Sequence, residues 1–379
     1  MHYNTFQGKE ISRLGFGLMR LPMDENGKID YAAGQEMIDY ALANGINYID
    51  TAYKYHDGEA ERFAGVALSK HHRESFYLAS KLPTWLCKTE EDVLRIFEEQ
   101  LGKCQTEYFD FYLLHSIDED SWPNIPKLNM VDFVKKEKEA GRIKHIGASF
   151  HCGPELLRQI LSEYGDVLEF IQLQLNYMDW DYYNAKELYE IGREFNTPII
   201  VMEPIRGGML ANPLSEKARE ILDSTGTGAS YASYALRFVN EKEGILVTLS
   251  GMSNLEQLKA NIEIFNGPAL NEAENKAIAD AVKALQTDIL VPCTGCNYCY
   301  ECPANIKIPE LFKMYNEAAS KGFHHIWGSL SGQYNALPAN GKDCIGCGNC
   351  ESHCPQKINI IKLMKEIDAK YQHLAEIGE

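Results

Sequence analysis

Short apolar runs alternate with segments of helical spacing along most of the chain. Residues 31–43, for example, place Met37, Tyr40 and Ala41 on one face, and Asn44-Gly45 follows as a helix C-cap would. The apolar runs predict eight strands, at residues 14–19, 46–50, 76–81, 108–115, 144–149, 168–175, 198–203 and 245–250. The segments between and after them predict helices at residues 31–43, 59–69, 90–102, 129–140, 154–163 and 184–195, within 214–240, and at 254–264.

Eight strand–helix units are the number that a closed (β/α)₈ barrel, the TIM barrel of the α/β class, requires. A short hairpin is predicted over residues 1–13, with Gln7-Gly8-Lys9 as its turn. Residues 271–286 predict a further amphipathic helix, after which we place a domain boundary: residues 1–287 form the barrel and residues 288–379 a small second domain. In the second domain we predict a helix at 309–321, followed by a loop rich in Gly and Asn.

Length and composition agree with two domains and exclude several classes of protein. The chain has 379 residues, whereas a barrel typically needs roughly 250. Apolar residues make up 45%, but no run reaches the roughly 18 apolar residues of a membrane span. The first ten residues lack the apolar stretch of a secretory signal, so we expect a cytoplasmic protein. The formal net charge of -17 argues against nucleic acid as a partner, since its phosphates require Lys and Arg.

Four side chains suited to proton transfer lie at three successive predicted strand ends. Asp50 ends the strand at 46–50 and Tyr55 follows in the loop, while Lys81 and His115 close the next two strands. The carboxyl ends of the strands carry the catalytic residues of a (β/α)₈ barrel. Any one of these residues alone would more often be an ordinary surface residue. Together, in this arrangement, they indicate an active site.

Eleven cysteines are present, and eight of them form two runs near the C-terminus. The second run, Cys344, Cys347, Cys350 and Cys354 before Pro355, has the bacterial ferredoxin spacing; the first, Cys293, Cys296, Cys299 and Cys302 before Pro303, is one residue shorter in its last gap. In two-cluster ferredoxins the fourth cysteine of each run ligates the other cluster. This rule assigns one [4Fe-4S] cluster to Cys293, Cys296, Cys299 and Cys354, and a second to Cys344, Cys347, Cys350 and Cys302. Structural zinc, with four thiolates per ion, is the alternative.

The three other cysteines, Cys87, Cys104 and Cys152, are scattered through the barrel sequence. They lack the spacing of a ligand run, and free cysteines are among the most buried residue types. We therefore predict that they are small buried apolar residues.

The order and context of Asp50, Tyr55, Lys81 and His115 resemble those of the aldo-keto reductase family. The resemblance implies that Tyr55 is the general acid, that Lys81 and Asp50 tune it, and that His115 orients the substrate carbonyl. A free phenol has a pKa of roughly 10, and a nearby ammonium would lower this value toward the working pH. It further implies hydride transfer between NAD(P)H and a carbonyl or alcohol substrate, and an N-terminal hairpin that plugs the bottom of the barrel.

The same resemblance implies a set of cofactor-binding residues. Ser149 and Gln174 would hold the nicotinamide carboxamide, although Phe150 stands where the family has Asn. The loop at 202–210 would face the nicotinamide ring and wrap the pyrophosphate through Met202, Pro204, Arg206, Gly208 and Leu210. The loop and helix after the eighth strand would bind the adenosine end through Ser250, Gly251, Met252, Gln257 and Asn261, since helix N-termini favour phosphate. Gly251 and Gln257 stand where NADP-specific members carry Lys and Arg, so both NADP and NAD are open.

Barrel and cysteine runs together resemble a branch of the aldo-keto reductases with a C-terminal ferredoxin-like domain. Two hypotheses add to carbonyl reduction: the clusters trade single electrons with ferredoxin or another carrier, or the barrel belongs to a redox sensor that binds cofactor without turnover. The substrate depends on loops at 83–89, 116–128 and 177–183, where Trp85, Trp122 and Trp180 either line the pocket or pack elsewhere.

Overall fold

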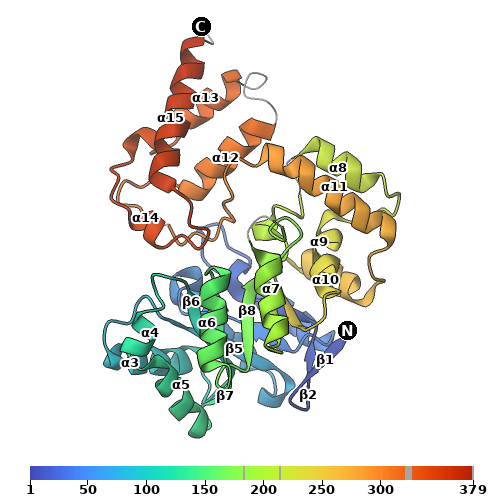
Figure 1. The fold of residues 1–379 in the computed structure, drawn as a ribbon, viewed down its shortest axis with the longest axis vertical. Helices are drawn as coiled ribbons and strands as arrows, with labels where there is room; N and C mark the ends of the chain where they lie inside the picture. Colours follow the sequence, from blue (N-terminus) through green and yellow to red (C-terminus); the bar gives the residue numbers. More distant parts are fainter. Residues whose placement is uncertain (182–183, 213–214, 300, 321–326, 378–379) are drawn as a thin grey trace. The chain divides into compact units, whose positions relative to one another are not determined.

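The computed structural model describes residues 1–181, 184–212, 215–299, 301–320 and 327–377 (Figure 1). By internal packing the chain divides into two compact units, Met1–Pro204 with Ser233–Leu270 and Ile205–Ala232 with Asn271–Glu379. Each unit contains a hydrophobic core of its own. The domain boundary that the sequence places after residue 287 stays a prediction.

The first unit contains a closed barrel of eight parallel strands, which confirms the predicted fold. The strands are β3 (Leu14–Gly17), β4 (Tyr48–Asp50), β5 (Tyr77–Pro83), β6 (Phe109–Ile117), β7 (Ile143–Phe150), β8 (Phe170–Gln174), β9 (Ile199–Met202) and β10 (Ile245–Gly251). Each strand pairs with the next, and β10 closes the barrel on β3, where Thr248 is in register with Leu14. Most strand residues are buried, as parallel strands covered by helices require.

The helices of the first unit follow the strands and lie outside the barrel (Figure 1). They are α1 (Tyr31–Ala43), α2 (Glu59–Leu68), α3 (Glu90–Cys104), α4 (Asn124–Lys127), α5 (Met130–Glu139), α6 (Pro154–Tyr164), α7 (Ala185–Glu194), most of α9 (Tyr231–Asn240) and α10 (Leu255–Asn266). Side chains cap the free amides at several helix starts, among them Asp30 for α1, Thr89 for α3 and Asn254 for α10. Three 3-10 turns, η1 (Leu18–Arg20), η2 (Tyr55–Gly58) and η3 (Arg73–Ser75), connect strands to helices or helices to strands.

The N-terminal hairpin closes the end of the barrel at which the strands begin. Its strands β1 (Tyr3–Phe6) and β2 (Lys9–Ser12) pair antiparallel, as predicted. Asn4 Nδ2 donates to the carbonyl oxygen of Ile245, the first residue of β10, at 2.9 Å. Phe6 and Ile11 belong to the core cluster inside the barrel, where the Phe6 and Phe111 ring centroids lie 5.7 Å apart. The hairpin does not cover the opposite end of the barrel, where the strands end and where (β/α)₈ barrels carry their catalytic residues.

The second unit is built from helices around its own apolar core. It contains α8 (Glu216–Asp223), α11 (Glu272–Asp288), α12 (Ile308–Ser320), α13 (Trp327–Ala336), α14 (Asn349–Ser352), α15 (Ile360–Ile377) and the 3-10 turns η4 (Arg206–Gly208) and η5 (Gly341–Asp343). Helix α11 packs on α8. Leu311 and Phe312 of α12 meet Met364 and Ile367 of α15 in the core, and most of the clustered cysteines pack against it. In the part of the chain that is described, every helix is too short or too polar to cross a membrane.

Helix α13 corrects the prediction of a loop over residues 327–336, while residues 321–326 lie outside the described residues. Its sequence is rich in Gly, Ser and Asn, which have low helix propensity, so local spacing does not reveal it. Tertiary contacts fix it instead: the Tyr334 ring stacks on Tyr371 of α15 at 4.3 Å, and its hydroxyl donates to Asp368 at 2.9 Å. Tertiary packing supplies most helical stability in proteins.

Candidate functional site

The structure brings the four sequence-predicted catalytic residues together where β4, β5 and β6 end. Asp50 is the last residue of β4, Tyr55 opens η2, Lys81 lies on β5 and His115 on β6. Lys81 Nζ donates to both carboxylate oxygens of Asp50 at 2.7 Å and lies 3.4 Å from the Tyr55 hydroxyl. The Tyr55 and His115 rings meet edge to face, with centroids 6.2 Å apart. One ammonium therefore links a carboxylate to a phenol beside an imidazole.

Burial sets the electrostatics of the Lys81–Asp50 pair, since Lys81 is fully buried and Asp50 nearly so. Burial raises the pKa of Asp50 and the Lys81 ammonium opposes this rise. Burial likewise lowers the pKa of Lys81, and the Asp50 carboxylate opposes that change. The Thr51 carbonyl oxygen accepts a further hydrogen bond from Lys81 Nζ at 2.8 Å. These charge-assisted bonds hold the ammonium in one position.

His115 is held as a neutral imidazole. Burial lowers its pKa well below the ordinary value, and the Lys81 ammonium and His151 lower it as well. A neutral imidazole has one N–H that can donate to a carbonyl oxygen. Thr84 Oγ1 donates to the backbone carbonyl oxygen of His115 at 2.9 Å, and the Trp85 ring centroid lies 5.1 Å from that of the imidazole.

The loop that carries Tyr55 has a strained backbone. His56, Asp57 and Gly58 follow one another with φ of 50°, 56° and 87°. Non-glycine residues rarely adopt this left-handed conformation, and strain of this kind clusters at functional sites. The neighbouring Tyr53 has a different environment, because its hydroxyl donates to Glu99 on α3 at 2.7 Å. Tyr55 and Tyr53 thus differ in surroundings although they lie two residues apart.

The three tryptophans of the predicted pocket loops separate in the structure. Trp85 contacts His115, whereas Trp122 packs on Tyr164 with centroids 5.7 Å apart and Trp180 packs on Tyr189 at 5.3 Å. Residues 182–183 of the third loop lie outside the described residues.

Sequence reasoning missed Thr84 and His151, both of which act on His115. Each follows directly after the last residue of a strand, Thr84 after β5 and His151 after β7. A position at or just after a strand end is also the feature that indicated the four predicted catalytic residues. Polar residues that directly follow each strand would therefore have included Thr84 and His151.

The residues predicted to face the nicotinamide lie at the carboxyl ends of strands β7, β8 and β9. In the structure they form hydrogen bonds within the protein. Ser149 Oγ accepts from the N–H of Ser116 at 2.8 Å, and the Gln174 amide donates to Asp179 at 2.7 Å. Phe150 is buried. Met202 Sδ accepts from the Gln172 amide at 3.4 Å. The role of Ser149, Gln174 and Met202 toward a cofactor stays a prediction.

The residues predicted for the adenosine end gather at the start of α10. Ser250 Oγ accepts from Asn261 Nδ2 at 3.0 Å between buried side chains, and Met252 is buried beside them in sequence. Gln257 is exposed, and its Oε1 accepts from the N–H of Ser253 at 2.8 Å. These residues cap and brace the helix start, and their role toward a nucleotide stays a prediction.

The stem of the Arg20 side chain lies against the loop before this helix. A Cβ added to Gly251 would overlap the Arg20 side-chain stem, so the arginine lies directly against the loop. Arg20 belongs to η1, immediately after the first barrel strand. An arginine near a helix N-terminus would add to the attraction of that helix end for a phosphate group.

The rest of the predicted pyrophosphate loop belongs to the second unit. Pro204 is buried at the end of the first unit, and Arg206 and Leu210 are buried in the second. The N–H groups of Gly208 and Leu210 both donate to the carbonyl oxygen of Ile205 at 3.1 Å. These amides are thus bonded inside the turn, and their role toward a pyrophosphate stays a prediction.

One predicted set of cluster ligands is Cys293, Cys296, Cys299 and Cys354. Burial, and after it the neighbouring thiolates of Cys296, Cys293 and Cys354, raises the pKa of Cys299 to about 12. Cys354, from the other run, is thus among the cysteines whose charge acts on Cys299. The N–H of Gly295 also donates to Cys293 Sγ at 3.4 Å.

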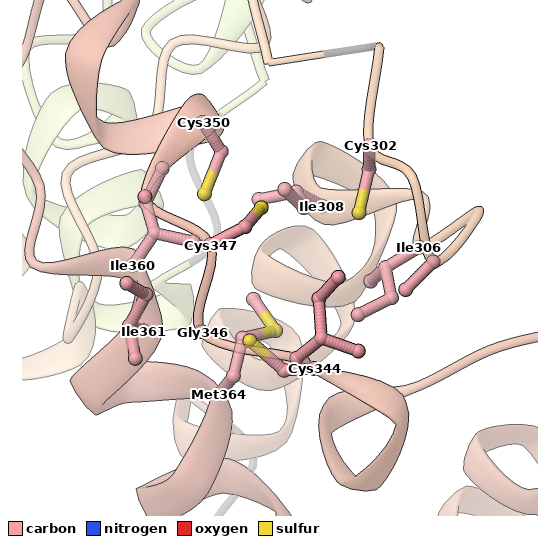
Figure 2. Close-up of a pocket in the computed structure, with 13 residues that line it drawn as sticks. Cys302, Ile306, Ile308, Cys344, Gly346, Cys347, Cys350, Ile360, Ile361 and Met364 are labelled. Atoms are coloured by element: carbon pink, nitrogen blue, oxygen red, sulfur yellow. The ribbon is translucent and has the colours of Figure 1, made fainter.

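The second predicted set lines one pocket of the second unit. Figure 2 shows the sulfur atoms of Cys302, Cys344, Cys347 and Cys350 around a common space, with Ile306, Ile308, Ile360, Ile361 and Met364 beside them. Cys302, from the first run, thus joins three cysteines of the second. An apolar pocket with four convergent thiols fits a cluster ligated by cysteine.

Structural zinc is the alternative to a cluster at these cysteines. Four thiolates around Zn²⁺, with bonds of about 2.3 Å, would lie about 3.8 Å from one another. Among the described residues, no three Cys, His, Asp or Glu side chains form a group that could hold one metal ion. Cys87, Cys104 and Cys152 are buried, as predicted, and burial raises the pKa of each thiol.

Two family models match this sequence. The aldo/keto reductase family model covers residues 13–283, and the 4Fe-4S dicluster domain model covers residues 292–359. The first match spans most of the chain, and the second covers both cysteine runs.

Individual relatives agree with the first match. The chain is 28% identical to the probable aldo-keto reductase 1 of Glycine max over 210 residues, which is 53% of this chain and 58% of that protein. It is 22% identical to the uncharacterized oxidoreductase YqkF of Bacillus subtilis, over 72% of this chain and 94% of that protein.

Solved structures share the barrel. The holo form of an aldo-keto reductase from Bacillus halodurans is 24% identical, with a TM-score of 0.60 over 75% of this chain and 97% of that one. An aldo/keto reductase from Klebsiella pneumoniae in complex with NADP and acetate is 21% identical, with a TM-score of 0.61 over 72% of this chain and 92% of that one. On the family match and the barrel, this chain belongs to the aldo/keto reductase family of oxidoreductases, and it carries a C-terminal 4Fe-4S dicluster domain.

Proposed function

We propose that this protein catalyses hydride transfer between NAD(P)H and a carbonyl or alcohol substrate, with Tyr55 as general acid. The observation that carries the proposal is the position of Lys81 Nζ, 2.7 Å from both Asp50 oxygens and 3.4 Å from the Tyr55 hydroxyl. This buried arrangement serves proton transfer better than it serves stability, because a buried ion pair is seldom more stable than an apolar replacement.

Each residue of the set has a chemical role in the proposal. His115, as a neutral imidazole, donates a hydrogen bond to the substrate carbonyl oxygen and orients it toward Tyr55. Tyr55 gives its proton to that oxygen as negative charge develops there. The Lys81 ammonium stabilises the charge that forms on the Tyr55 oxygen, and Asp50 holds Lys81 in place.

When bound, a nicotinamide cofactor supplies the hydride and [4Fe-4S] clusters supply single electrons. The start of α10, with Arg20 against Gly251, would hold phosphate of the nucleotide. The loop in which NADP-specific family members carry basic residues has none here, and Arg20 comes from a different part of the chain. The proposal therefore includes both NADP and NAD as the cofactor. The eight clustered cysteines would hold two clusters in the crossed arrangement described above.

Replacing Tyr55 with Phe tests the general acid. We expect Tyr55→Phe to lower kcat for aldehyde reduction by about 10² or more, with the dissociation constant for the nicotinamide cofactor unchanged. Tyr53→Phe is the matched control, because it removes a phenol from the same loop that bonds Glu99 instead. Steady-state kinetics and fluorescence titration of the cofactor measure both. Unchanged turnover in folded Tyr55→Phe would contradict the assignment.

The clusters are proposed to exchange single electrons with ferredoxin or another carrier, so that a substrate harder to reduce than a simple aldehyde is within reach. Protein whose clusters have been dissolved by oxidation should then lose part of its substrate range. If rate and range stay the same, the clusters are structural. Tight cofactor binding without turnover of any aldehyde or ketone would instead favour a redox sensor.

A further inference from the structure

The turn η4 of the second unit lies against the segment that leads into the first cysteine run. Gly207, in the middle of this turn, has φ of 64°, and a Cβ added to it would overlap the carbonyl oxygen of Thr294. The next residue, Gly208, is also left-handed, with φ of 93°, but a Cβ there would meet nothing within 4 Å. Both glycines relieve backbone strain, and Gly207 alone of the two also permits a close backbone approach.

Arg206, directly before Gly207, brings a cation to the same segment. Its side chain is fully buried, and a guanidinium N–H donates to the Pro292 carbonyl oxygen at 3.5 Å. That oxygen belongs to the peptide group whose N–H is the amide of Cys293. A buried positive charge therefore lies next to the backbone of the first cysteine of the run.

The contact with Gly207 also bears on a hydrogen bond to sulfur. The Thr294 carbonyl and the Gly295 N–H are the two ends of one peptide group, and this N–H donates to Cys293 Sγ at 3.4 Å. Gly207 packs at the carbonyl end of the group, so the position of η4 sets the tilt of the N–H end. Displacing Thr294 would displace the donor.

The segment has little freedom to move away from η4. Asn316 of α12 is buried and holds Val291 from both sides, donating to its carbonyl oxygen at 2.8 Å and accepting from its N–H at 2.9 Å. Val291 itself is part of the core of the second unit. Cys293 thus lies two residues beyond a fixed point and is braced on the other side by Arg206 and Gly207.

We propose that Arg206 and Gly207 are positioning residues for the iron–sulfur cluster assigned to Cys293, Cys296, Cys299 and Cys354. Gly207 keeps the N–H to sulfur bond of Cys293 in place, and Arg206 places positive charge beside an anionic cluster. Hydrogen bonds to sulfur and local charge both set the reduction potential of such clusters. The inference rests on the clusters of the proposed function. It assigns Arg206 a role at the cluster, whereas the sequence predicted that Arg206 binds the cofactor pyrophosphate.

Gly207→Ala and Gly208→Ala form a matched pair that tests the proposal. Both variants place an alanine at positive φ, 64° at position 207 and 93° at position 208, and only the first overlaps Thr294. Redox titration of anaerobically purified protein, followed by EPR, measures the midpoint potential of each cluster. We expect Gly207→Ala to lower the reduced-to-oxidised ratio of one cluster at fixed potential about tenfold, a shift of about 59 mV for one electron, and Gly208→Ala to leave both midpoints unchanged. Equal midpoints in both variants and the wild type would overturn the proposal.

Arg206→Gln and Arg206→Lys provide a second test should Gly207→Ala fail to assemble its clusters. Arg206→Gln removes the charge, so the same midpoint should fall, and Arg206→Lys should restore most of it. Iron and sulfide are counted in each variant. Wild-type midpoints in a fully loaded Arg206→Gln would overturn the proposal, as would absence of sulfide from the wild-type protein. If the wild-type protein holds both clusters but does not reduce carbonyl substrates, the proposed reductase activity is refuted and the proposal for Arg206 and Gly207 is not affected.

Discussion

Lys81 and Asp50 show what a charge needs in order to be buried at a reactive position. Removing either ion from water costs several kcal/mol, and two bonds of 2.7 Å together with the Thr51 carbonyl offset that cost. The sequence locates both residues at strand ends but contains no sign that they touch. Their contact follows from the pairing of β4 with β5, which puts Asp50 in register with Ala79, two residues before Lys81.

Removing one member of this pair is expected to be costly. Asp50→Asn should lower the free energy of unfolding of the barrel by about 3–5 kcal/mol, because Lys81 would keep a buried ammonium without its counter-charge. Urea unfolding followed by circular dichroism measures the change. The double variant Asp50→Asn with Lys81→Met should regain part of the loss, since it removes the orphaned charge. Wild-type stability in Asp50→Asn would mean that the ion pair is not buried as described.

At the scale of elements, Glu169 joins three parts of the barrel at the end closed by the hairpin. Its carboxylate accepts from Gln7 in the hairpin turn at 2.8 Å, from the N–H of Ile146 at 2.9 Å and from His145 of β7 at 3.0 Å, and Lys138 of α5 pairs with it. Burial opposes ionisation, but hydrogen bonds from His145, Lys138 and Ile146 outweigh it and lower the pKa of Glu169 to about 2.

This shift predicts acid sensitivity. A carboxyl whose pKa is lower in the folded state contributes stability above its ordinary pKa of 4.5, and the contribution is lost as the pH falls toward 2. The Tm should therefore decline over this window, and Glu169→Gln should flatten part of the decline. Glu190→Gln, at an exposed position on α7, is the control and should leave the slope unchanged. An identical slope in Glu169→Gln would show that Glu169 does not link these elements.

Elements differed in how far their local sequence revealed them. Helix α1 has the predicted bounds because its apolar spacing, its Asp30 cap and its Asn44-Gly45 end are all local features. Helix α13 was missed because its stability depends on Tyr334 against α15, a contact between distant parts of the chain. The local sequence therefore predicts helices whose spacing and caps are local features. It misses helices that are stabilised by tertiary contacts with distant parts of the chain.

At the scale of the whole molecule, each of the two cysteine runs places its last cysteine with the other run. Cys302 lies with Cys344, Cys347 and Cys350 around one pocket, and Cys354 lies near Cys299 of the other run. The shorter last gap of the first run does not prevent Cys302 from reaching that pocket. Each run thus depends on the other for a complete set of four thiols.

Loss of one crossing cysteine should therefore cost a single cluster. We expect about eight iron and eight sulfide per chain in the wild-type protein and about four of each in Cys302→Ala, measured after anaerobic purification. Cys104→Ala is the control, because it removes a buried thiol of the barrel outside both runs. Zinc without sulfide in the wild type would refute the clusters. Full iron in Cys302→Ala would refute the crossed assignment.

The sequence by itself determined the barrel, the four residues at its strand ends and the two cysteine runs, because periodicity and spacing are local properties of the chain. The tertiary structure decided which distant residues meet. It placed Arg20 at Gly251, Trp85 at His115, and Arg206 at the segment before Cys293. These contacts join positions far apart along the chain, and their geometry depends on how whole elements pack, which no local pattern encodes.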